Sequence, residues 1–128
     1  MIVTLDFEFG EMRIFERFVV VVMKEGITVW PKYNEDLVNV ADKYFKDVPF
    51  GYITCRENSY AVDPLIYIKT SKIKNLVAFA VVVTTAGLKI TNLEIEKMFL
   101  TKPLKIFQNL DDAKNWVNEI INNQPSII

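Results

Sequence analysis

The sequence predicts a mixed α/β domain, in which an N-terminal antiparallel hairpin is followed by α, β, α, β, α, β and α segments. Residues 3–9 alternate apolar and polar side chains, which is typical of a half-buried strand. Residues 18–23 and 76–84 are almost continuously apolar, which is typical of strands covered on both faces. Because helices alternate with the later strands, the connections between those strands are crossovers and the sheet is partly parallel.

The opening strands form the predicted hairpin. Gly10 and Glu11 predict a tight turn, and residues 12–16 then return as the partner of residues 3–9. The carboxylates of Asp6, Glu8 and Glu11 lie close together in this arrangement. They are either a cation-binding or acid–base cluster, or the solvated face of an edge strand, and the absence of companion ligands nearby favours the edge strand.

The first helix begins at Asn34, whose side chain is predicted to cap it, and ends before Pro49. Its predicted apolar stripe is Leu37, Val38, Ala41, Tyr44 and Phe45. Residues 52–55 follow as a strand, in which Cys55 is expected to be a small buried residue rather than a nucleophile.

The remaining helices have recognisable N-terminal signals. Asp63 and Pro64 start a short helix that ends near Thr70, and Thr91 and Glu94 have the spacing of a capping box. The helix opened by that box is predicted to bury Ile95, Met98 and Phe99.

The last predicted elements are a strand over residues 104–107 and a helix capped by Asn109. The buried stripe of that helix is predicted to be Ala113, Trp116, Val117, Ile120 and Ile121. We therefore expect residues 1–128 to form a single domain, with a frayed tail from about residue 122.

Composition excludes several classes of function. The 128 residues contain no histidine and one cysteine, which removes imidazole bases, histidine metal ligands, thiolate zinc sites and intrachain disulfides. A net charge of −1 provides no field that attracts nucleic acid. The longest apolar run, residues 76–83, is too short to span a membrane, and no signal peptide opens the chain, so a cytoplasmic location is expected. No cofactor and no metal site is predicted.

Two stretches carry a resemblance to a known family. Residues 51–64 read GYITCRENSYAVDP and residues 106–117 read IFQNLDDAKNWV. With the order of elements, they resemble the STAS fold of anti-sigma-factor antagonists and sulfate-transporter tails, and more narrowly the small stand-alone STAS-like proteins of bacteria. The resemblance implies a non-catalytic, regulatory module that binds a protein partner, such as an anti-sigma-type kinase or a similar regulator.

The resemblance also implies a candidate phosphoacceptor. In the antagonist branch, a serine at the start of a helix after a central strand is phosphorylated to break the complex. Ser59 lies in the corresponding connection, although it follows Asn58 where that branch has an aspartate.

The polar connection between the strand at 52–55 and the helix at Asp63 is the main candidate site. Its candidates for binding a partner or an anion are Arg56, Asn58, Ser59, Tyr60 and Asp63. The alternative is a satisfied surface loop, in which Arg56 pairs with Glu57 or Asp63 and the Asp63 carboxylate occupies the helix N-terminus.

Aromatic residues define a second candidate surface and a second hypothesis. Trp30 and Tyr33 form either a contact patch or the cover of the core beneath their loop. The alternative function is a carrier of a small apolar or amphipathic, lipid-like ligand in a pocket beside the sheet, lined by Trp30, Phe50, Tyr60 and Tyr67.

The third hypothesis is an enzyme. Its acid or base would have to be a carboxylate or a lysine with a pKa shifted by its environment, and no pair of such residues stands out in the sequence.

The opening strands also offer an edge for homodimer pairing.

Overall fold

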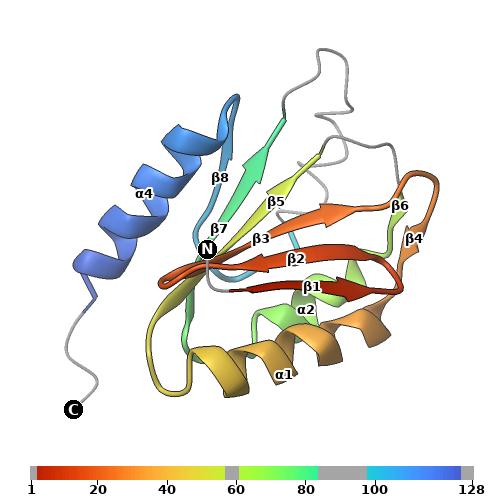
Figure 1. Cartoon of the computed structure of the whole chain (residues 1–128), viewed down its shortest axis with the longest axis horizontal. Helices are drawn as coiled ribbons and strands as arrows, with labels where there is room; N and C mark the ends of the chain where they lie inside the picture. Colours follow the sequence, from red (N-terminus) through yellow and green to blue (C-terminus); the bar gives the residue numbers. More distant parts are fainter. Residues whose placement is uncertain (1–2, 57–60, 84–97, 125–128) are drawn as a thin grey trace.

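A six-stranded mixed sheet forms the centre of the molecule (Figure 1). The computed structural model describes residues 3–56, 61–83 and 98–124. The strands, in their order across the sheet, are β1 (Val3–Phe7), β2 (Gly10–Ile14), β3 (Phe18–Met23), β5 (Phe50–Cys55), β7 (Leu76–Val82) and β8 (Leu104–Phe107). The first three pair antiparallel and the last four pair parallel, which confirms the mixed α/β fold with an antiparallel edge.

Helices cover both faces of the sheet. Helix α4 (Leu110–Asn122) lies on one face, and α1 (Asn34–Tyr44) and α2 (Leu65–Thr70) lie on the other (Figure 1). A short 3-10 helix, η1 (Pro31–Tyr33), leads directly into α1. Two short strands that the sequence did not predict, β4 (Thr28–Val29) and β6 (Ala61–Val62), pair in parallel as a separate small sheet.

The hairpin turn lies two residues earlier than predicted. Residues Glu8 and Phe9 form the turn, and Gly10 already belongs to β2. Phe9 leaves the strand at this point and becomes buried, with 3% of its surface exposed. Gly10 has a φ of 154°, and a Cβ there would collide with the carbonyl oxygen of Val22, so the close approach of β2 to β3 requires glycine.

Asn34 does not cap α1 as predicted. The turn of η1 leads directly into α1, so Asn34 is the first helical residue and Tyr33 stands at the N-cap position, without a side-chain cap bond. Val38 is exposed and Val40 is buried instead, because the apolar stripe of α1 runs through Leu37, Val40 and Ala41.

Other predicted helix ends are confirmed. The Asn109 Oδ1 accepts a hydrogen bond from the Asp112 backbone N–H at 2.8 Å, which caps α4 as predicted. Helix α2 ends at Thr70 as predicted, but it begins one residue later than predicted, with Pro64 rather than Asp63 at the N-cap position; Asp63 Oδ1 still accepts from the Leu65 backbone N–H at 3.1 Å. The predicted helix from Thr91 lies mostly outside the described residues. At its end, Met98 lies in a turn and is 81% exposed, so the prediction of a buried Met98 is wrong.

The two faces of the central strands carry side chains of different size. Toward α4, the sheet presents Gly51, Ala78 and Ala80, so this helix packs closely against the strands. Toward α1 and α2, it presents the rings of Tyr52 and Phe79. The molecule therefore has two cores, a tightly packed one beneath α4 and a larger one beneath α1 and α2.

The contact between α4 and Gly51 gives a first prediction. A Cβ at Gly51 would collide with Cγ1 of Val117, so we expect Gly51→Ala to lower the free energy of unfolding by about 1–3 kcal/mol. Val117→Ala removes the colliding methyl groups, so Gly51→Ala should cost less in the Val117→Ala background than in the wild type. The measurement is urea unfolding of both single variants and the double variant, and strictly additive effects would contradict this account of the packing.

Candidate functional site

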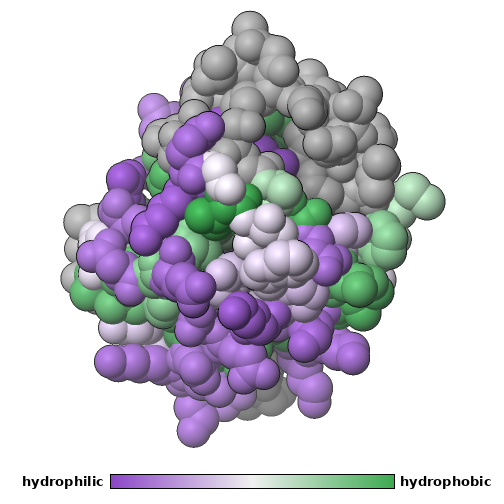
Figure 2. Space-filling model, turned by 90° about the vertical axis from the view of Figure 1, so that its right-hand side faces the viewer, coloured by the Kyte–Doolittle hydropathy of each residue, from purple (hydrophilic) through white to green (hydrophobic). Residues whose placement is uncertain are grey.

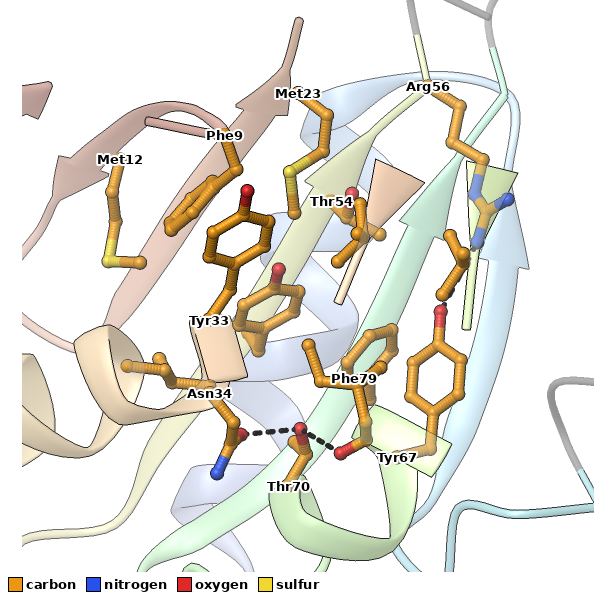
Figure 3. A pocket seen from close by; sticks show the side chains of 15 residues that line it. Phe9, Met12, Met23, Tyr33, Asn34, Thr54, Arg56, Tyr67, Thr70 and Phe79 are labelled. Atoms are coloured by element: carbon orange, nitrogen blue, oxygen red, sulfur yellow. Dashed lines mark hydrogen bonds between the residues drawn. The ribbon is translucent and has the colours of Figure 1, made fainter. Parts of the chain in front are cut away.

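A pocket lies in the larger core, between the sheet and helices α1 and α2 (Figure 3). Every described element from the turn after β1 to β7 contributes at least one wall residue. The lining residues are Phe9, Met12, Met23, Val29, Tyr33, Asn34, Leu37, Tyr52, Thr54, Arg56, Val62, Ile66, Tyr67, Thr70 and Phe79. Most of these side chains are apolar or aromatic, which is typical of a small-molecule site.

The free space inside the pocket is small. Its cavity volume is about 40 Å³, which is room for a few water molecules, within a hollow of about 520 Å³ that includes solvent at the opening. Two methionines, Met12 and Met23, form part of the wall, and methionine side chains are unbranched and change rotamer readily. A ligand larger than water therefore enters by moving flexible side chains.

Aromatic rings form one wall of the pocket. Tyr52 and Phe79, from neighbouring parallel strands, stack with ring centroids 4.6 Å apart. Tyr67 of α2 meets Phe79 edge-on, at 5.6 Å and 80°. Because these rings brace one another, they form a rigid wall opposite the methionines.

One charged side chain enters this wall. Arg56 directly follows β5 and is partly buried, and its Nη2 donates to the Tyr67 Oη at 3.5 Å (Figure 3). Among the described residues that line the pocket, Arg56 is the only one with a charged side chain. The alternation of Tyr52, Thr54 and Arg56 along β5 places all three on the pocket side of the sheet.

A buried hydrogen bond joins the two helices at the other end of the pocket. Thr70 Oγ1 of α2 donates to Oδ1 of Asn34 in α1 at 2.7 Å, with the Ile66 carbonyl oxygen a second acceptor at 3.0 Å. Asn34 and Thr70 are both buried. These polar groups satisfy one another, so this end of the pocket does not require a polar ligand group.

Tyr33 closes the pocket beside the hairpin turn. Its ring lies 5.2 Å from that of Phe9, and its hydroxyl donates to Glu8 Oε1 at 3.2 Å. Partial desolvation, the hydrogen bond to Glu8 and the negative charges of Glu8 and Asp36 raise the pKa of Tyr33 above its ordinary value. Desolvation and the charges of Glu35 and Glu8 likewise raise the pKa of Asp36. The hydroxyl of Tyr33 thus remains a donor near neutral pH.

The structure brings together some of the residues that the sequence singled out. Arg56, Tyr33 and Tyr67 line the same pocket. Asn58, Ser59 and Tyr60 lie outside the described residues. The Asp63 carboxylate is engaged at the start of α2, as the loop alternative for this residue predicted.

Two predicted aromatic residues have other roles. Trp30 is 49% exposed and does not line the pocket, so the prediction that it lines a ligand pocket is wrong. It lies at the N-terminus of η1, where the chain leaves β4 for the surface. Phe50 also does not line the pocket, because it is fully buried and stacks on Phe45 at 4.7 Å.

The acidic residues of the hairpin do not converge on a common site. Asp6 and Glu11 are cross-strand partners, and Glu11 forms an ion pair with Arg13 at 2.8 Å. Glu8 lies in the turn rather than on the strand and accepts from Tyr33. Within residues 3–56, 61–83 and 98–124, no group of three or more acidic or cysteine side chains is placed to hold a metal ion. Cys55 is buried, as predicted.

The sequence analysis missed several lining residues. Met12, Met23, Thr54, Asn34 and Thr70 all contribute to the pocket. Of these residues, Thr54 could have been predicted from the sequence. Side chains alternate between the two faces of a strand, so Thr54 lies on the same side as Arg56. The methionines and the Asn34–Thr70 pair had no such signal, because they converge only in the folded chain.

Comparison of the chain with protein-family models, with curated proteins and with solved structures finds no match in any of the three. Among the helices of the described residues, none is long and apolar enough to cross a membrane.

The Asn34–Thr70 bond gives a second prediction. Thr70→Val keeps the shape of the side chain but leaves the buried Asn34 amide without its hydroxyl donor, so we expect a loss of about 1–3 kcal/mol in unfolding free energy. Adding Asn34→Leu to Thr70→Val should restore part of that loss, because no buried polar group then remains unsatisfied. Urea unfolding of the three variants checks this, and a double variant less stable than Thr70→Val would contradict it.

Proposed function

We propose that this protein is a non-catalytic module that binds a small apolar or amphipathic molecule in the pocket between the sheet and helices α1 and α2. The observation that carries the proposal is the lining itself, in which most side chains are apolar or aromatic. Pockets of this composition bind ligands by burying their apolar surface.

The absence of histidine from the chain supports binding rather than catalysis. The hydroxyl of Tyr33 donates a hydrogen bond to Glu8, which lies in the exposed turn, so the pair does not bracket the interior of the pocket. No described carboxylate lines the pocket to serve as a base. The side chains of the pocket wall therefore favour binding of a ligand over catalysis.

A pocket-filling variant tests the proposal. Val62 of β6 lines the pocket, whereas Val38 on α1 is exposed and does not. We expect Val62→Trp to weaken binding of the neutral fluorophore N-phenylnaphthylamine at least about tenfold, because the indole occupies the space that the probe needs. Val38→Trp adds the same indole at the surface and is the matched control, and thermal unfolding confirms that both variants are folded. No binding of the fluorophore by the wild type, or equal binding by both variants, would contradict the pocket as a binding site.

The resemblance to STAS proteins supports a second candidate function, a regulatory module that docks on a protein partner through residues 56–63. The surface beside this segment favours docking. Trp30 and Leu65, which follow the paired strands β4 and β6, are 49% and 52% exposed. Figure 2 views the molecule from this side and shows hydrophobic next to hydrophilic surface. Exposed large apolar side chains are enriched at docking surfaces. A partner of the anti-sigma-kinase type and phosphorylation of Ser59 belong to this candidate.

The second candidate has its own test. Leu65 and Val48 are equally exposed, at 52%, but Val48 precedes β5 whereas residue 56 follows it, so the two positions lie at opposite ends of that strand. If this face docks a partner, that partner should be captured by the wild type and by Val48→Ser, and lost on Trp30→Ser combined with Leu65→Ser. Native mass spectrometry of the captured complexes gives the measurement. Retention of the same partner by the double variant would rule out this face.

A further inference from the structure

Strand β1 lies at one edge of the six-stranded sheet, and of the strands in the described residues β2 alone pairs with it (Figure 1). We propose that the outer edge of β1 pairs antiparallel with β1 of a second copy of this chain, with Leu5 on the two-fold axis. The sheets of the two copies then form one continuous sheet. This assembly is independent of what the pocket binds.

The two edges of the sheet differ in how strongly they discourage pairing. The other edge strand, β8, has four residues, and one of them is the exposed Lys105, a residue type that protects edges from further strands. Strand β1 has five residues without lysine or proline, and its register with β2 is regular from Val3 to Phe7. A regular edge strand of this kind is a template for another strand.

The hairpin turn determines which backbone groups of β1 point outward. The loop consists of Glu8 and Phe9, so Phe7 and Gly10, which close it, form a hydrogen-bonded pair. Bonding to β2 alternates along the strand, so the backbone N–H and C=O groups at positions 4 and 6 point away from β2. With the two-fold axis at position 5, these groups of one copy face the corresponding groups of the other.

The same register matches apolar side chains on the face toward the larger core. Val3, Leu5 and Phe7 are only partly buried and pack against that core. In the pairing, Leu5 lies opposite the partner's Leu5, and Val3 lies opposite the partner's Phe7. Directly opposite side chains have Cβ atoms about 4.5–5.5 Å apart, so each copy covers apolar surface of the other.

On the opposite face, charge favours the same register. Thr4 and Asp6 are exposed, and within one copy Asp6 lies opposite the like-charged Glu11. In the pairing, Asp6 lies opposite the neutral Thr4 of the second copy, and Arg13 of that copy follows in the same row. Thr4 and Arg13 keep the interactions that they make within their own chain, such as the bond from Arg13 to Glu11. A two-fold axis at position 6 would instead place two Asp6 carboxylates opposite each other.

Charge substitutions at position 4 test this register, because Thr4 lies opposite Arg13 within its own chain. Thr4→Asp faces Asp6 of the second copy with a like charge, whereas in the monomer it faces an arginine, so the fold is retained. Thr101→Asp makes the same exchange at an exposed position before β8, at the other edge of the sheet, and is the matched control. Sedimentation equilibrium of the full chain, at concentrations up to about 1 mM, gives the dissociation constant of the dimer. Thermal unfolding verifies that each variant is folded.

We expect the wild type to dimerise, Thr4→Asp to weaken the dimer about tenfold, and Thr101→Asp to leave it unchanged. Combining Thr4→Asp with Asp6→Lys places opposite charges face to face and should restore the dimer. If Thr4→Asp does not fold, Thr4→Lys decides the matter, because its positive charge faces Asp6 of the second copy and should tighten the dimer.

Other outcomes would overturn the proposal. A wild type that is monomeric at every concentration would exclude self-pairing and leave the edge of β1 for a segment of a different protein. A dimer that Thr4→Asp and Thr101→Asp affect equally would have a different interface. A dimer that Thr4→Asp weakens and the added Asp6→Lys does not restore would have a different register.

Discussion

The central strands β3, β5 and β7 are buried on both faces, and the rest of the structure depends on how each face is covered. On the side of α4, glycine and alanine at Gly51, Ala78 and Ala80 lie among larger apolar side chains such as Ile53 and Val82, and at Gly51 the helix approaches the sheet so closely that a Cβ would collide with Val117. On the side of α1 and α2, Tyr52 and Phe79 project from the same strands. Rings of this size hold α1 and α2 away from the backbone of the sheet. Side chains from many elements fill the space between these helices and the sheet.

The pocket follows from this difference between the faces. Side chains that converge from several elements pack less completely than one helix on a row of small residues, and flexible methionines occupy the irregular space that remains. The buried Thr70–Asn34 bond joins the short α2 to α1, and Tyr67 of the same helix α2 accepts from Arg56. The stability of the core and the geometry of the site thus depend on the same contacts.

Much of the fold could be predicted because its signals are local. The apolar run of β3, the bounds of β8 and the Asn109 cap each depend on a few adjacent residues, and the structure has them as predicted. The errors occur where distant residues compete with a local preference. Asn34 is a residue type that often caps helices, but the chain enters α1 directly from η1, so Asn34 is already helical and its amide oxygen accepts from Thr70, which is 36 positions away.

In the candidate site, too, individual residues could be predicted from local sequence, whereas their contacts could not. Arg56 and Tyr67 were singled out from the sequence for separate reasons, one as an anion ligand and the other as a pocket aromatic, and only the crossing of α2 over the sheet places them 3.5 Å apart. The sequence by itself determined that the six strands of the main sheet exist, most of the helices and the lack of imidazole chemistry, because periodicity and composition are properties of the chain alone. The tertiary structure decided which side chains share a pocket, since that depends on contacts between residues far apart in the chain.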